Sequence, residues 1–213
     1  MKKRIFLLIS IMFLLTSCTS INKKDYSKII DEVINSRYTI NNEYRTGYKY
    51  YAPSGLTSMS STDYNEVLQS SKYRYYLYVD VVSYYNRVIQ EYDEDSNAYF
   101  SKVINHDDKF GYIEINLQEN KKYLVEIMYN YAKIEVMVEE DDINYAVTNA
   151  MIVLSSIDYN SDILSSIIGD NVLEFNEETF DIFQAKKKET TYLDVGSSSN
   201  TEETKEHDPD LIK

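Results

Sequence analysis

The stretch "FGYIEINLQENKKYLVEIMYNYAKIEVMVEE" (residues 110–140) decides the fold. Apolar and polar residues alternate in three runs along it, and this period of two is the pattern of strands with one buried face. The links between the runs are very short. Because parallel strands need a crossover of about a dozen residues or more, such links predict that the three strands are antiparallel neighbours.

The apolar residues of the three runs fix how the strands pair. Those that we expect to face the core are Ile113, Ile115, Val125, Ile127, Ile134, Val136 and Val138. The second and third strands bring them together only across a loop with an even number of residues, such as Asn130-Tyr131. Asparagine tolerates the left-handed backbone of such a turn, whereas Tyr131 suits it less well. The first and second strands need an odd loop, such as residues 119–121.

This register predicts a row of three carboxylates on the other face of the sheet. Glu114 lies opposite Glu126, Glu126 lies opposite Glu135, and Tyr112 flanks the row. Neighbouring strands are about 4.8 Å apart, and like charges directly opposite each other destabilise a sheet. The row is either a solvated outer face or a candidate site for a cation or a basic partner segment. Both interpretations fail if a helix at residues 25–36 covers this face.

Further strands and helices flank this stretch. Residues 73–86 and 98–104 predict two more strands, which gives a sheet of about five. Helices are predicted over residues 25–36, from Asp141 or Asp142 to about Ile157, and over residues 161–168. Their N-caps would be Asp25, Asp141 or Asp142, and Ser161. The predicted fold class is therefore α+β, an antiparallel meander packed against N- and C-terminal helices.

The helix that ends near Ile157 is expected to pack against a second element besides the sheet. Ile152 lies outside its main apolar seam, and residues 161–168 offer an apolar stripe to pack on it. Two other segments give weaker patterns. Residues 37–70 suggest only a loop beside an irregular strand, and residues 172–183 predict an edge strand or a short helix.

The first residues have the pattern of a targeting signal. Lys2, Lys3 and Arg4 precede an uncharged apolar run at residues 5–15. A membrane-spanning helix needs about 20 apolar residues, and this run has about half that number, as in the apolar region of a secretory signal. The run ends in Leu15-Thr16-Ser17-Cys18.

These four residues resemble the lipobox of bacterial lipoproteins. The resemblance covers only residues 1–20. It implies a diacylglyceryl group on the sulfur of Cys18, cleavage between Ser17 and Cys18, and a protein held by its lipid on the outer face of a bacterial membrane. Cys18 is the only cysteine, so it forms no internal disulfide. The alternatives are an ordinary signal peptide followed by a chance cysteine, or a short N-terminal anchor helix.

The charge of the chain excludes some partners. The formal net charge is −13, and removal of the three basic residues before Ser17 changes it to −16. A protein this acidic does not bind nucleic acid or anionic lipid through its net field. We therefore expect the lipid to supply the contact with the membrane.

Motifs for catalysis or metal binding are absent from the sequence. His106 and His207 are the only histidines, which excludes the usual zinc sites. The stretch "DEDSNAY" begins like a calcium loop, but Ala98 replaces the required glycine and Ile104 replaces the bidentate glutamate. No P-loop, dinucleotide or nucleophile-elbow pattern occurs. We therefore expect no cofactor, no metal and no catalytic residue.

The sequence thus predicts a lipoprotein with one folded domain. The expected parts are a signal peptide (1–17), a lipidated tether (18–24), a single domain (25–185) and a disordered polar tail (186–213). The expected function is that of a non-enzymatic binding or assembly module of the cell envelope. The alternative is an envelope hydrolase that uses paired carboxylates.

Overall fold

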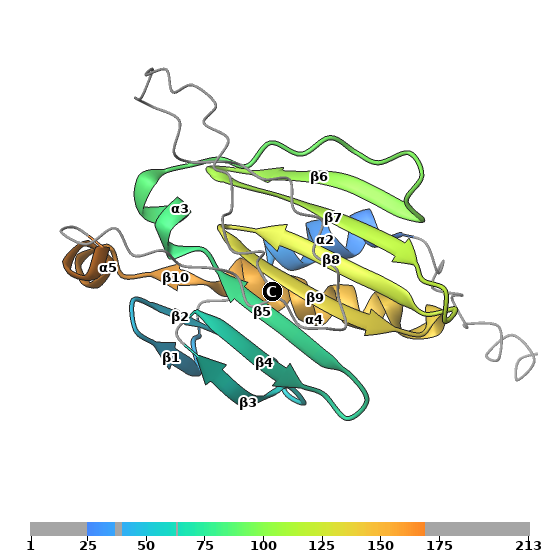
Figure 1. Cartoon of the computed structure of the whole chain (residues 1–213), viewed down its shortest axis with the longest axis horizontal. Helices are drawn as coiled ribbons and strands as arrows, with labels where there is room; N and C mark the ends of the chain where they lie inside the picture. Colours follow the sequence, from blue (N-terminus) through green and yellow to red (C-terminus); the bar gives the residue numbers. More distant parts are fainter. Residues whose placement is uncertain (1–24, 37–39, 63, 169–213) are drawn as a thin grey trace, which may run out of the picture. The chain divides into compact units, whose positions relative to one another are not determined.

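The computed structural model describes residues 25–36, 40–62 and 64–168 (Figure 1). The lipobox, the segment 172–183, the domain end at 185 and the tail lie outside these residues. The chain divides into two units, residues 1–178 and 179–213, and every described residue belongs to the first. Within the described residues, no helix is both long enough and apolar enough to cross a membrane.

A seven-stranded antiparallel sheet forms the centre of the described unit. Its strands are β3 (Thr57–Thr62), β4 (Asn65–Gln69), β5 (Arg74–Val79), β6 (Phe100–His106), β7 (Lys109–Leu117), β8 (Tyr123–Tyr129) and β9 (Ala132–Val138). They are ordered β3-β4-β5-β9-β8-β7-β6. The α+β class is confirmed, with more strands than the expected five, because residues 57–69 supply two strands where the sequence pattern suggested only a loop beside an irregular strand.

The predicted register of β7, β8 and β9 is confirmed. Ile113 pairs with Ile127 and Ile127 with Ile134, so the branched apolar side chains meet on one face. In the neighbouring row, Val125 lies between Ile115 and Val136. All of these side chains are fully buried, and they form the centre of the core.

The two loops that set this register have the expected lengths. Asn130 and Tyr131 form the turn between β8 and β9, with φ angles of 54° and 61°. The loop between β7 and β8 closes with a bond from the Gln118 N–H to the Lys122 carbonyl at 2.8 Å, which leaves an odd loop of three residues. Both loops therefore keep the apolar residues of consecutive strands on the same face.

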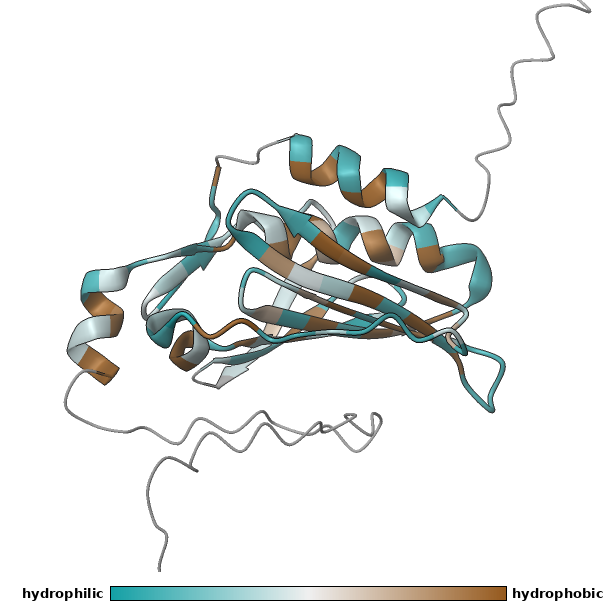
Figure 2. Ribbon diagram, turned by 90° about the horizontal axis from the view of Figure 1, so that it is seen from above, coloured by the Kyte–Doolittle hydropathy of each residue, from teal (hydrophilic) through white to brown (hydrophobic). Residues whose placement is uncertain are grey.

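Helices cover one face of the large sheet. In Figure 1, α2 (Tyr26–Asn35) and α4 (Ile143–Ser156) lie behind the strands, and α4 contacts β8 and β9. Asp25 caps α2 as predicted, since its carboxylate accepts the Lys28 N–H at 3.2 Å. The apolar side of α2 faces the rest of the unit (Figure 2), and the Tyr26 ring meets the Phe100 ring of β6 edge-on at 5.1 Å.

A small three-stranded sheet lies on the same side of the large sheet as these helices, and its strand β2 contacts α4. It consists of β1 (Glu43–Arg45), β2 (Tyr48–Tyr50) and β10 (Asp158–Tyr159), ordered β1-β2-β10. The Arg45 guanidinium binds the Glu66 carboxylate on the covered face of β4, where Glu66 is almost completely buried. This ion pair joins the small sheet to the large one. Breaking one partner of such a pair leaves an uncompensated buried charge.

The predicted strand at residues 73–86 is too long. The strand β5 ends at Val79, and α3 (Val81–Asn86) follows it. Asp80 causes the change, because its carboxylate accepts the Ser83 N–H at 2.8 Å and the Ser83 hydroxyl at 2.7 Å. An aspartate that can satisfy the first free N–H groups of a helix favours a helix start over a continued strand.

The predictions for the C-terminal helices need two corrections. The second cover of α4 is α2, whereas α5 (Ser161–Ile168) contacts α3. The caps also differ. Asn160, rather than Ser161, accepts the Ile163 N–H at 3.1 Å. Asp142 precedes α4 without capping it, because its carboxylate accepts the Tyr73 hydroxyl at 2.5 Å and the Lys72 ammonium at 3.1 Å.

Asn130 offers a test of the turn between β8 and β9. Asn130→Ala should lower the free energy of unfolding by about 2 to 3 kcal/mol in urea denaturation. Alanine is disfavoured in the left-handed conformation, and the change removes the amide that donates to the Ile157 carbonyl at 3.0 Å. Asn130→Gly keeps the backbone conformation accessible and should cost at least about 1 kcal/mol less. Equal losses in both variants would show that the left-handed backbone is not the constraint.

Candidate functional site

The predicted carboxylate row lies on the outer face, meaning the face of the large sheet opposite α2 and α4. Glu114 pairs with Glu126, and Glu126 pairs with Glu135. The row continues to Tyr76 on one side and to Ser101 on the other. The three carboxylates therefore share one face, and the helix at residues 25–36 lies on the other face.

The expectation that the whole row is exposed is wrong. Glu114 and Glu135 are each only 6% exposed, and Glu126 is half-buried. The sequence pattern could not indicate this burial, because it comes from long side chains on neighbouring strands and from residues 88–99. Of the three carboxylates, Glu126 is the one that a partner can reach directly.

Two of the carboxylates are bound by their own neighbours on the sheet. The Lys133 ammonium lies 3.0 Å from a Glu135 oxygen. The Tyr112 hydroxyl donates to Glu126 at 2.6 Å. Burial, and then the neighbouring Glu126 carboxylate, raises the pKa of Tyr112 well above its ordinary value, so this phenol stays protonated and remains a donor. The predicted residue Tyr112 is thus a partner of the row.

The third carboxylate is held by the segment that connects α3 to β6. We call residues 88–99 the strap. The Tyr92 hydroxyl donates to Glu114 at 2.6 Å, and Asn116 donates to the other Glu114 oxygen at 2.6 Å. The Tyr92 ring stacks on the Tyr112 ring, with centroids 4.0 Å apart and planes 5° apart. Burial and the hydrogen bond to Glu114 raise the pKa of Tyr92 to about 12.

Other contacts fix the strap to the edge of the sheet. The Glu94 carboxylate accepts the Val103 N–H of β6 at 3.0 Å, and the Asp95 N–H donates to the Ser101 hydroxyl at 2.9 Å. These bonds satisfy groups on an edge strand that would otherwise be open to pairing with another chain. The strap also carries Glu91 and Asp93, both exposed, so it adds negative charge beside the row.

The contacts of the row limit what it can bind. A lysine, two phenols and an amide relieve the repulsion between the three carboxylates within the domain. The described residues contain no group of three or more His, Cys, Asp or Glu side chains placed to hold a metal ion. The row can act as an acidic surface at Glu126 and the strap, whereas its two buried carboxylates, Glu114 and Glu135, already have partners within the domain.

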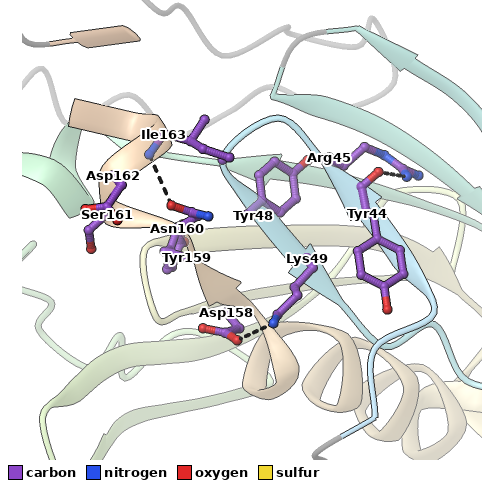
Figure 3. Close-up of a pocket in the computed structure, with 11 residues that line it drawn as sticks. Tyr44, Arg45, Tyr48, Lys49, Asp158, Tyr159, Asn160, Ser161, Asp162 and Ile163 are labelled. Atoms are coloured by element: carbon purple, nitrogen blue, oxygen red, sulfur yellow. Dashed lines mark hydrogen bonds and ion pairs between the residues drawn. The ribbon is translucent and has the colours of Figure 1, made fainter. Parts of the chain in front are cut away.

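A pocket of about 410 Å³ opens between the β1–β2 hairpin, β10 and the start of α5. Figure 3 shows Tyr48 and Lys49 from the hairpin near Asn160 and Ile163 from the start of α5. The Lys49 ammonium lies 3.1 Å from the Asp158 carboxylate, a pair drawn at one edge of the pocket. The pocket combines aromatic rings with polar groups from segments more than 100 residues apart.

Sequence reasoning missed this pocket because two of its three walls come from residues 37–70 and from the two residues of β10, which the sequence pattern did not assign to strands. The hairpin is only three residues long on each side, too short for a period-two pattern to stand out. Gly47 was the available signal. Its φ of 88° allows the tight turn, and a Cβ there would collide with the Leu164 side chain, so this glycine marks the contact between the hairpin and α5.

Comparison of the sequence with protein-family models found no match. Comparison with curated proteins found none either. The site is therefore interpreted from its own geometry.

Tyr92 tests whether the strap stabilises the row. Tyr92→Phe keeps the ring stack but removes the hydroxyl bound to Glu114, so the free energy of unfolding should fall by about 1 to 2 kcal/mol. The matched control is Tyr85→Phe, on an exposed tyrosine, which should change it by less than about 0.5 kcal/mol.

The stability difference caused by Tyr92→Phe should also depend on pH. A phenol whose pKa is raised by folding contributes its full stability below its ordinary pKa of 10.0 and loses it as the pH rises through about 12. The difference in unfolding free energy between the unsubstituted chain and Tyr92→Phe should therefore shrink between these two pH values. A difference that stays constant would contradict the assigned contact.

Proposed function

We propose that this chain is a membrane-anchored extracytoplasmic lipoprotein whose domain is a non-enzymatic binding or assembly module of the cell envelope. The observation that carries the proposal is Leu15-Thr16-Ser17-Cys18 after a basic start and a short apolar run. Two acyl chains give stable anchoring where one gives only marginal binding. The domain would then act at the outer side of the membrane.

The proposed binding surface is the acidic part of the outer face, at Glu126 and the strap. A basic protein segment fits it better than a metal ion, because an extended chain can contact scattered carboxylates one at a time, whereas a metal needs several at one point. Binding is also favoured over hydrolysis. All three carboxylates of the row already have a lysine, a phenol or an amide as partner, which leaves no free acid and base pair among them.

The lipid anchor can be tested directly. Mass spectrometry of the mature N-terminal peptide should find a chain that begins at Cys18 and carries a diacylglyceryl group. Cys18→Ser should block processing or release the domain from the membrane fraction, while Ser17→Ala, which keeps a small residue before the cysteine, should leave both unchanged. An unmodified Cys18, or a peptide that begins elsewhere, would disprove the anchor.

The acidic surface can be tested with an oligolysine peptide as the probe. Glu126→Gln should weaken its binding by up to about fivefold, since an exposed ion pair contributes up to about 1 kcal/mol. Binding should also weaken with salt, because exposed charges are screened over about 10 Å at 0.1 M. The control is Glu119→Gln, at an exposed position in the loop between β7 and β8. Equal effects of both variants would mean that only the net charge attracts the peptide.

A further inference from the structure

We propose that the pocket between the β1–β2 hairpin, β10 and α5 binds a neutral polyhydroxylated ligand of the size of a single sugar ring. This inference goes beyond the proposed function, because the pocket is built from other elements than the outer face and needs neither the lipid nor a protein partner. Its volume of about 410 Å³ lies within the range of small-molecule sites, about 300–1,000 Å³.

The walls of the pocket are fixed by contacts on their far sides. The Tyr159 hydroxyl donates to the Asn130 carbonyl at 2.7 Å, and its ring stacks on Tyr84 with centroids 3.9 Å apart. The Asn160 N–H donates to the Gly47 carbonyl at 2.8 Å, which joins the start of α5 to the hairpin. Leu164, one turn into α5, is completely buried. A pocket with pre-ordered walls binds a small ligand without the cost of ordering them.

The charges around the pocket exclude anionic ligands. Lys49 is neutralised by Asp158 at 3.1 Å, and Arg45 binds both Glu43 and Glu66. Helix N-termini often attract anions, but Asp162 already places a carboxylate in the first turn of α5. Phosphate or carboxylate ligands would therefore meet a site with net negative charge.

The polar groups that remain suit hydroxyls. Asp162 has no partner among the described residues and accepts hydrogen bonds. Asn160 uses its side-chain oxygen to cap α5, so its amide NH₂ remains a donor. A ligand hydroxyl both donates and accepts, so adjacent hydroxyls on one ring can use both groups. Charge-assisted hydrogen bonds to a carboxylate are the stronger kind, which gives Asp162 the larger share of the affinity.

The aromatic groups distinguish a sugar from an organic cation. A cation is recognised by several open ring faces, but Tyr48, which lines the pocket, is only 3% exposed and offers little open ring face. Tyr44 is 67% exposed, and its hydroxyl is fixed by a bond to the Asn41 carbonyl at 3.1 Å. Tyr44 therefore offers one open ring, in the same strand-pairing row as Lys49 and Asp158, and a single ring face suits the flat, apolar side of a sugar ring.

The proposal can be tested by ligand-observed NMR titration of the full chain in detergent. The probes are N-acetylglucosamine and glucose as neutral sugars, choline as a cation and acetate as an anion. We expect saturation transfer to at least one neutral sugar and none to acetate. Asp162→Ala should weaken that binding by about tenfold, and Tyr44→Ala should also weaken it. Asp31→Ala, which removes an exposed carboxylate on α2, is the charge-matched control and should have no effect.

Three results would overturn the proposal. They are tighter binding of choline than of either sugar, no binding of either sugar at millimolar concentration, and equal affinities of Asp162→Ala and Asp31→Ala. Unchanged melting temperatures of Asp162→Ala and Tyr44→Ala would show that any loss of binding is not a loss of fold. Asp162→Ala could lower the melting temperature, because the first turn of α5 loses a favourable charge. In that case the affinity of Tyr44→Ala for the sugar is the test, since Tyr44 lies on the small sheet and not on α5.

Discussion

The turn at Asn130 and Tyr131 is the constraint on which the rest of the fold depends. Both residues have a left-handed backbone, and the two-residue loop allows only one register between β8 and β9. The sheet grows from this pair in both directions, with β7 on β8 and β5 on β9. A slip of one residue would turn every apolar side chain of a strand to the outer face. A left-handed pair that lacks glycine is costly, and side-chain contacts hold it in place.

The same register produces the carboxylate row, so core packing alone is enough to explain why the three glutamates align. Hydrogen bonds and an ion pair from the sheet and from the strap stabilise the row. Tyr92 of the strap contributes twice, because its ring stacks on Tyr112 and its hydroxyl donates to Glu114. Repulsion that is relieved internally needs no external cation. A binding role therefore depends on the accessible part of this surface, which is Glu126 at the middle of the row and the exposed acidic residues of the strap.

The sequence predicted the parts of the fold in which one pattern dominates. Residues 110–140 alternate without interruption, so both their strands and their register could be derived. Residues 57–69 could not be assigned because serine and threonine occupy both faces of β3, an edge strand with a bulge near Met59. The burial of Glu114 was not predictable either. It depends on Tyr92, 22 residues away in a segment that resembles an exposed turn.

The turn also contributes contacts that hold one wall of the pocket in place. A tyrosine with positive φ is strained, and replacement by glycine would relieve that strain at Tyr131. The tyrosine ring, however, meets the Tyr84 ring edge-on at 5.6 Å, and Tyr84 stacks on Tyr159 in the pocket wall. The Tyr159 hydroxyl returns to the carbonyl of Asn130. The turn, α3 and β10 thus form one closed set of contacts, so the residue that strains the turn also helps to hold the wall of the pocket.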